Sequence, residues 1–216
     1  FSWSPNEADS GLSSVTMIVT DEFGLSDTAL SMVRALVGPP YKVNIQTDTV
    51  YLGEVTALDV SLRNREPLGA FHLLVHVDPG TLAVLAVTTV GRRAAGFEYF
   101  NATVNSGITP GDIRVIGIAD QIGGSVTPPL DPGDGPLFGI NVILSTNSGL
   151  SGLFLPVTFV SRDQPGGVDN TLTDALGVRV TDSTVGFTTG GFLMKNQLLA
   201  GVLDFLNFLF AFSSPT

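Results

Sequence analysis

The chain has 216 residues, of which 44% are hydrophobic and only 14% are charged, and it contains 25 glycines and 13 prolines. This composition favours an all-β fold of many short strands joined by turns. Twenty acidic against ten basic residues give a net charge of −10, which repels phosphate backbones and excludes nucleic acid as an expected partner. The absence of cysteine excludes a disulfide framework, a thiolate metal site and a cysteine nucleophile.

Composition also favours an extracellular or cell-surface protein, because the chain is rich in Thr, Ser, Asn, Gly and Asp and poor in Lys and Glu. Residues 1–10 are polar and lack a basic region followed by an apolar run, so we expect the chain to begin after processing or as a fragment. The strongly apolar stretch at residues 198–212 is shorter than the roughly 20 residues that a membrane-spanning helix needs, and no membrane span is expected.

Residues 1–37 are predicted to form a β-hairpin with a lead-in segment. Val15, Met17 and Val19 alternate with Thr16, Ile18 and Thr20, Asp21-Glu22-Phe23-Gly24 predicts a turn, and residues 29–33 form the returning strand. The segment resembles the C-terminal half of the Ig-like and cadherin-like repeats of bacterial surface proteins, on Phe1-Ser2-Trp3-Ser4-Pro5, Val19-Thr20-Asp21 and Gly24-Leu25-Ser26-Asp27-Thr28. The resemblance implies that about half of such a domain is missing.

A lone hairpin does not cover its own apolar face and is marginal in water. An upstream segment, the neighbouring domain or a strand from another copy would therefore cover it, unless it is a truncated remnant. Gly38-Pro39-Pro40 predicts a stiff linker over residues 38–41. Residues 42–195 then form a second domain, and residues 196–216 form a tail.

The second domain is predicted to contain about nine strands in two facing sheets. Apolar side chains recur at every second residue, which places them on one face of each strand. The sets are Val43, Ile45 and Thr47; Leu58, Val60 and Leu62; Phe71, Leu73, Val75 and Val77; Ile113, Val115 and Gly117; Phe138, Ile140, Val142 and Leu144; Leu153, Leu155, Val157 and Phe159; and Val178 and Val180.

Over residues 42–195 the order of segments resembles a cohesin, the β-sandwich receptor module of cellulosome-type assemblies, and its carbohydrate-binding-module relatives. The motifs that carry the resemblance are residues 50–55, 58–64, 68–73, 77–82, 111–115 and 135–140. It implies a jelly-roll β-sandwich, and a dockerin or a glycan as partner.

Residues 198–212 are predicted to form an apolar helix that is stable only when buried. Residues 202–209 are similar to the helix of a dockerin repeat, the usual partner of a cohesin, but the Asp- and Asn-rich calcium loop that precedes such a helix is absent. Central aromatic residues carry most of the energy of an interface, so the expected anchors are Phe205, Phe208, Leu209 and Phe212.

No constellation of residues indicates an active site, and neither a Gly-x-Ser-x-Gly motif nor a phosphate-binding loop is present. His72 and His76 would lie about 13 Å apart on one face of a strand, too far to share a metal ion. Among the acidic loops, Asp131 and Asp134 are weak calcium candidates beside the alternative of a solvated loop, and no other cofactor is expected. The pair Gly190-Gly191 is predicted to be a turn or bulge with positive φ.

Three functions remain open from the sequence. The leading hypothesis is a non-catalytic extracellular protein that self-associates head to tail into a filament or surface layer, because both ends of the chain carry uncovered apolar surface. The second is a carbohydrate-binding module, which needs a row of exposed aromatic residues. The third is a cohesin-type receptor for a dockerin-bearing partner.

Overall fold

The computed structural model describes residues 11–35, 39–105, 109–120, 127–162, 169–180 and 185–195. The chain divides into two units, Phe1–Pro40 and Tyr41–Thr216. Each unit is a β structure with its own strand pairing, so we describe the two units separately. Within the described residues, no helix has the length and hydropathy needed to span a bilayer.

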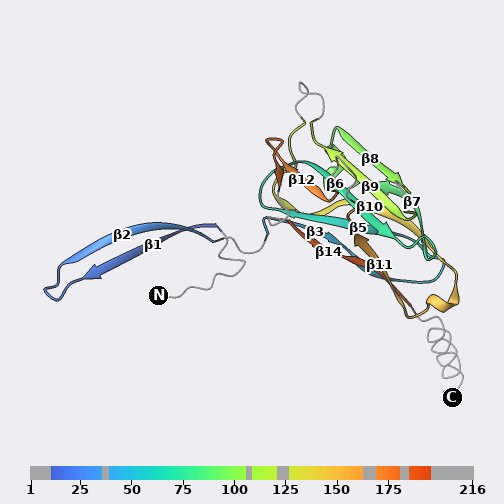
Figure 1. The fold of residues 1–216 in the computed structure, drawn as a ribbon, viewed down its shortest axis with the longest axis horizontal. Coiled ribbons are helices and arrows are strands. Elements are labelled where there is room, and N and C mark those ends of the chain that lie inside the picture. Colours follow the sequence, from blue (N-terminus) through green and yellow to red (C-terminus); the bar gives the residue numbers. More distant parts are fainter. Residues whose placement is uncertain are drawn as a thin grey trace, which may run out of the picture. The chain divides into compact units, whose positions relative to one another are not determined.

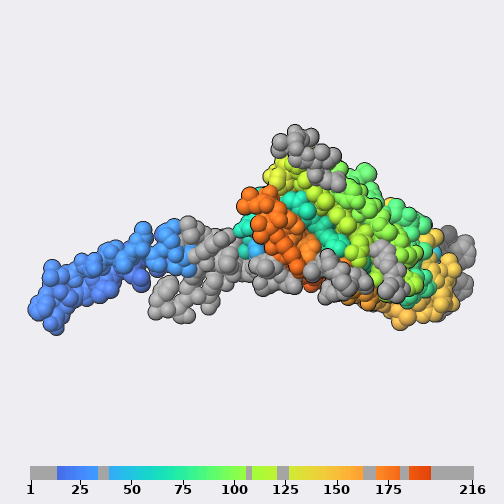
Figure 2. Space-filling view, turned by 45° about the horizontal axis from the view of Figure 1, so that its top comes forward, coloured from blue at the N-terminus to red at the C-terminus, as the bar shows by residue number. Residues whose placement is uncertain are grey.

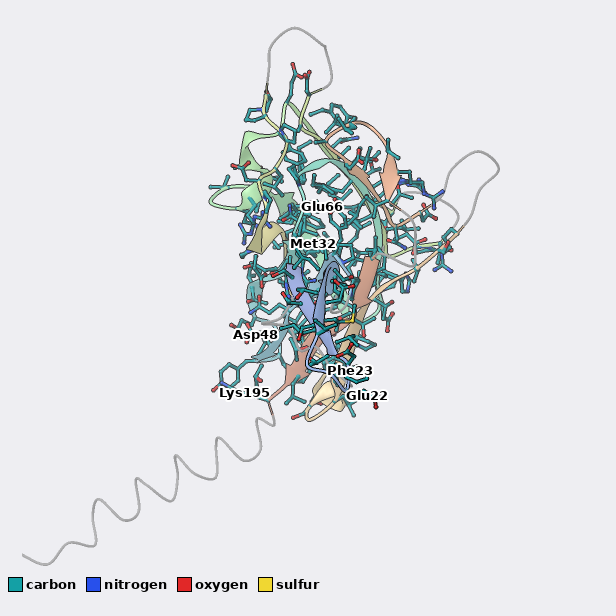
Figure 3. All side chains as sticks on the ribbon, turned by 90° about the vertical axis from the view of Figure 1, so that its left-hand side faces the viewer. Glu22, Phe23, Met32, Asp48, Glu66 and Lys195 are labelled. Carbon is teal, nitrogen blue, oxygen red and sulfur yellow. The ribbon has the colours of Figure 1, made fainter. Side chains whose placement is uncertain are left out.

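The first unit is an antiparallel hairpin of β1 (Gly11–Thr20) and β2 (Ser26–Ala35), as the sequence predicts (Figure 1). The turn between them is fixed by Asp21, whose carboxylate accepts hydrogen bonds from the backbone N–H groups of Phe23 and Leu25 at 2.9 and 2.8 Å. Gly24 has a φ of 81°, a conformation that favours glycine. Figure 3 labels Glu22 and Phe23 at this turn.

The second unit is a sandwich of two sheets (Figure 1). The five-stranded sheet has the order β14-β3-β5-β10-β7, and the eight-stranded sheet has the order β13-β12-β6-β11-β15-β4, with β9 also paired to β6 and β8 paired to β9. Two short 3-10 helices lie at Arg93–Gly96 and Ser148–Leu150. The strands are β3 (Tyr41–Ile45), β4 (Thr47–Val50), β5 (Val55–Asn64), β6 (Leu68–Val77), β7 (Leu82–Thr88), β8 (Tyr99–Val104), β9 (Asp112–Ile118), β10 (Gly133–Leu144), β11 (Phe154–Phe159), β12 (Thr171–Asp174), β13 (Arg179–Val180), β14 (Val185–Thr188) and β15 (Gly190–Met194).

The core lies between the two sheets, and the alternating apolar residues predicted from the sequence supply most of it. The predicted inward residues of β3, β5, β6 and β10 are all buried, as are Ile113, Val115, Leu155 and Val157. Three members of the predicted sets are wrong: Thr47 is exposed, Leu153 is 51% exposed and Val178 is 59% exposed. Thr47 is the first residue of the edge strand β4. Leu153 precedes β11, and Val178 belongs to the turn before β13, so neither lies on a paired strand that faces the core.

Two pairs of consecutive strands pass from one sheet to the other through a single residue. The chain crosses between β3 and β4 at Gln46 and between β14 and β15 at Thr189. The crossing segments run side by side, because β14 pairs with β3 and β15 pairs with β4, both in parallel. Every other strand pair in the described residues is antiparallel.

Gly190 and Gly191 lie where the two crossings meet. Gly191 has a φ of 148° and donates its N–H to the carbonyl of Gln46 at 3.0 Å. Gly190 needs no positive φ, contrary to the prediction; instead, a Cβ atom there would collide with the backbone carbonyl oxygens of Ile45 and Gln46. Close approach of two backbones therefore explains the first glycine of the pair, and backbone conformation together with a close approach to the carbonyl of Leu155 explains the second.

Candidate interaction surfaces

The hairpin exposes apolar side chains on both of its faces. Directly paired residues share a face, so the register places Val15, Met17, Val19, Ala29 and Val33 on one side, which we call the odd face. The even face carries Ile18, Leu30 and Met32 among threonines and serines. Met17 and Val19 are 52% and 71% exposed, and Ile18, Leu30 and Met32 are 65%, 68% and 57% exposed.

This exposure is costly for so small a unit. Full burial of a side chain of this size stabilises a fold by about 1.5–3 kcal/mol relative to exposure. A two-stranded sheet has no second layer to provide that burial. Both faces are therefore candidate interaction surfaces. The alternation in the sequence indicates only the odd face.

The outer face of the eight-stranded sheet carries a cluster of ion pairs that the sequence analysis did not predict. His76 on β6 lies opposite Asp112 on β9, and His76 Nδ1 and Asp112 Oδ1 are 2.7 Å apart. Arg162 Nε donates to Asp112 Oδ2 at 3.1 Å. The side chain of Asp112 is only 2% exposed, so it depends on these two partners for the interactions that water would otherwise supply.

The pKa of Asp112 reflects this balance. Burial alone would raise the pKa, but hydrogen bonds from Arg162 and His76 and the positive charge of both groups outweigh it. The pKa of Asp112 therefore lies below its usual value, and the carboxylate is ionised in the folded protein at neutral pH.

A second buried carboxylate, Asp169, lies in the same cluster. Asp169 Oδ1 is 3.4 Å from Arg114 Nη2, and Asp169 Oδ2 accepts the backbone N–H of Arg162 at 2.8 Å. Arg114 Nη1 lies 3.0 Å from Nε2 of His72. The two carboxylates thus connect strands β6 and β9 to Arg162 and Asp169, which lie on either side of residues 163–168.

Asn170 completes this attachment beside β6. Its side chain accepts the N–H of Leu74 at 2.9 Å and donates to the carbonyl of Val160 at 2.8 Å, and its φ is 59°. Leu74 alternates with the inward residues of β6 and so faces outward, yet it is fully buried. The cluster therefore holds part of the chain against the outer face of this sheet; Figure 2 shows β12 in orange beside β6 on that sheet.

The two histidines have separate partners. His76 contacts Asp112 and His72 contacts Arg114, and their side chains are 29% and 21% exposed. Among the described residues, no group of three or more His, Asp or Glu side chains could hold a metal ion.

The loop of the two calcium candidates is held by an arginine. Arg93 Nη2 donates to the backbone carbonyl of Asp131 at 2.6 Å, and Arg93 Nη1 donates to the carbonyl of Leu62 at 2.7 Å. Burial lowers the pKa of Arg93, whereas the negative charges of Asp134 and Asp131 act in the opposite direction. The side of this loop that faces Arg93 forms an open cavity of about 510 Å³, which is lined by Arg93, Asp131, Asp134, Phe97 and three prolines. Arg93 thus binds the backbone of this loop, and the calcium site at Asp131 and Asp134 stays a prediction.

The tyrosines do not form the exposed row that glycan binding needs. Tyr41 is buried at 2% exposure. Tyr51 follows the edge strand β4, and Lys195 Nζ lies 4.3 Å above the centre of its ring. Figure 3 labels Lys195 and Asp48 at this same edge. Tyr99 lies on β8, separated from both.

The predicted anchors Phe205, Phe208, Leu209 and Phe212 lie outside the described residues, as does Trp3. The tail that contains the anchors follows Lys195, the residue after β15. Lys195 donates its N–H to the carbonyl of Val50 at 2.8 Å, so the tail begins at the edge formed by β15 and β4. The anchors and the dockerin-like helix stay predictions.

Comparison with solved structures identifies the architecture. A type I cohesin–dockerin complex from Clostridium thermocellum matches with a TM-score of 0.54 and 14% identity, over 71% of this chain and 98% of the other. The solution structure of a cohesin from Clostridium acetobutylicum matches with a TM-score of 0.53 and 15% identity, over 74% of this chain and 93% of the other. The sandwich has a cohesin-like fold.

A non-cellulosomal cohesin from the hyperthermophilic archaeon Archaeoglobus fulgidus matches as well, with a TM-score of 0.51 and 17% identity, over 74% of this chain and 95% of the other. No protein-family model and no curated protein matches the sequence. The prediction of an all-β, cohesin-like sandwich is confirmed. At this level of identity the likeness to cohesins concerns the fold, and the Ig-like assignment of the hairpin stays a prediction.

Proposed function

We propose that this protein is a non-catalytic, extracellular structural protein whose cohesin-like sandwich and terminal segments mediate protein–protein assembly. In this proposal the hairpin is the open half of an Ig-like unit, and its odd face is covered by a neighbouring chain. The apolar tail supplies a second contact through Phe205, Phe208, Leu209 and Phe212. Contacts of this head-to-tail kind do not close on themselves, so they build a filament or a surface layer.

The exposed odd face of the hairpin carries the proposal. Met17 and Val19 are more than half exposed on a hairpin whose described residues form a single layer. The net charge of −10 keeps the chain soluble and makes nucleic acid an unsuitable partner. A protein partner with an apolar surface satisfies both observations.

Met17→Asp in the full chain is expected to reduce self-association, because a carboxylate on the odd face would have to be desolvated in the contact. We expect the wild-type chain to elute above its monomer mass in size-exclusion chromatography with light scattering and to form extended particles in electron microscopy. The variant should shift at least tenfold toward monomer at equal concentration, a change of about 1.4 kcal/mol in association free energy.

Leu25→Asp is the matched control, because Leu25 is 72% exposed but lies in the turn, outside both faces. It should associate like the wild type. A wild-type chain that stays a monodisperse monomer at high concentration would overturn the proposal, as would equal effects of the two substitutions.

A cohesin-type receptor is the second candidate function, favoured by the match to a cohesin solved with its dockerin. In this case the sandwich would bind a separate dockerin-bearing protein. Isothermal titration of the full chain with a purified type I dockerin should then show saturable binding with one dockerin per chain. Binding that is absent, or equally strong to a heat-denatured dockerin, would exclude a receptor for this dockerin type.

A further inference from the structure

The even face of the hairpin is apolar where a half-buried sheet would be polar. In a sheet covered on one side, residues of the uncovered side are polar, and half of the even face follows this rule with serine and threonine. Ile18, Leu30 and Met32 break it, and each is more than half exposed. The covering of the odd face in the proposed assembly leaves these three residues exposed, so the even face needs a separate partner.

The register makes the even face self-complementary. Its paired rows, from base to turn, are Leu12 with Arg34, Ser14 with Met32, Thr16 with Leu30, Ile18 with Thr28, and Thr20 with Ser26. The row that contains Leu30 is the third of the five. A twofold axis through this row places Leu30 against Leu30 of a second copy and the row of Ile18 against the row of Met32.

Charge supports the same antiparallel arrangement. The turn beyond the last row contains two acidic residues, Asp21 and Glu22. The twofold axis brings the base of each hairpin beside the acidic turn of the other. A parallel arrangement would instead place the two acidic turns together.

We propose that two copies of this chain pair through the even faces of their hairpins, antiparallel about a twofold axis at Leu30. The pairing rests on the self-association of the proposed function but uses the face opposite to the one proposed there. Ten residues from each copy form an interface at the small end of specific contacts, below about 1,200 Å² in total, so the pairing is weak for an isolated pair. The pairing becomes stronger when the same two chains are also joined through the odd face or the tail, because the second contact then forms within an existing complex.

Cysteine substitution tests this geometry, because the chain has no cysteine of its own. The full chain with Leu30→Cys, treated with a short bismaleimide cross-linker, is expected to give a covalent dimer, since two packed sheets lie about 10 Å apart. Thr28→Cys is the matched control on the same face. The axis places Thr28 far from Thr28 of the second copy, so the dimer yield of this variant should be at least fivefold lower. A mixture of Ile18→Cys and Met32→Cys chains should cross-link more than either chain alone.

The outcomes separate this inference from the proposed function. Equal yields for Leu30→Cys and Thr28→Cys, or no dimer with either, would overturn the twofold pairing and point to another occupant of the even face. If Met17→Asp still reduces association in that case, the proposed function stands without it. If Leu30→Cys gives the dimer although Met17→Asp has no effect, the pairing stands and the odd-face contact fails.

Discussion

Gly190→Ala is expected to lower the free energy of unfolding of the sandwich by about 3 kcal/mol or more, because the new methyl group overlaps backbone rather than a movable side chain. The Cβ atom would meet the carbonyl oxygens of Ile45 and Gln46, which are fixed by the strand pairing on both sides of the crossing. Relief requires the two crossing segments to separate, and the hydrogen bond from Gly191 to Gln46 would be lost with them. Urea denaturation followed by circular dichroism measures the change.

Gly96→Ala is the control for this substitution. Gly96 is exposed at the end of a short 3-10 helix, and a Cβ atom there meets no atom within 4 Å. A change within about 0.5 kcal/mol is expected, as for most surface substitutions. If Gly190→Ala is tolerated equally well, the backbone contact at the crossing is not as close as described.

Asp112→Asn is expected to destabilise the sandwich by about 2–3 kcal/mol at neutral pH. The substitution leaves Arg162 and His76 without their buried carboxylate, and hydrogen bonds to charged groups contribute about 1.5–3 kcal/mol. We expect less than the largest losses seen for broken buried ion pairs, because the side chains of Arg162 and His76 are 38% and 29% exposed and can regain water. Denaturation at pH 7 tests the magnitude.

The effect of Asp112→Asn also depends on pH in a defined direction. The folded-state pKa of Asp112 is lowered. Its contribution to the free energy of unfolding is therefore fully present above the unfolded-state pKa, near 3.9, and is lost as the pH falls through the folded-state pKa. The difference in unfolding free energy between wild type and variant should therefore narrow below about pH 4. Asp134→Asn, which removes an exposed carboxylate, should show no comparable narrowing. A constant difference from pH 7 to pH 3 would contradict the assignment.

Much of the sandwich could be predicted from the sequence because its strands bury one face each. Leu58, Val60 and Leu62 illustrate this: they alternate with polar residues, and all three are buried. The hairpin could also be predicted, because Asp21 and Gly24 form a turn between two alternating segments. Leu153 and Val178 show where the pattern fails, because alternation does not reveal where a strand ends.

The features that remained hidden depend on residues far apart in the chain. Asp112 and Arg162 are separated by 50 positions, so their ion pair follows from the tertiary fold and not from a local motif. The Gly-Gly pair predicts a turn or bulge at Gly190, because the neighbours of Gly190 in the sequence do not show that another backbone passes beside it. The apolar character of the even face was readable from Ile18, Leu30 and Met32, but it acquires meaning only once the register pairs their rows.

The parallel pairing of the first and last strands of the sandwich determines how the molecule would bear tension. A pull applied at Tyr41 and Lys195 draws β3 and β4 in one direction and β14 and β15 in the other, along the length of both ladders. The hydrogen bonds of each ladder are then loaded in shear and break together, rather than one at a time as in an unzipping hairpin. Resistance to stretching is set by the barrier to unfolding, so this arrangement suits a link in a chain that is pulled from both ends.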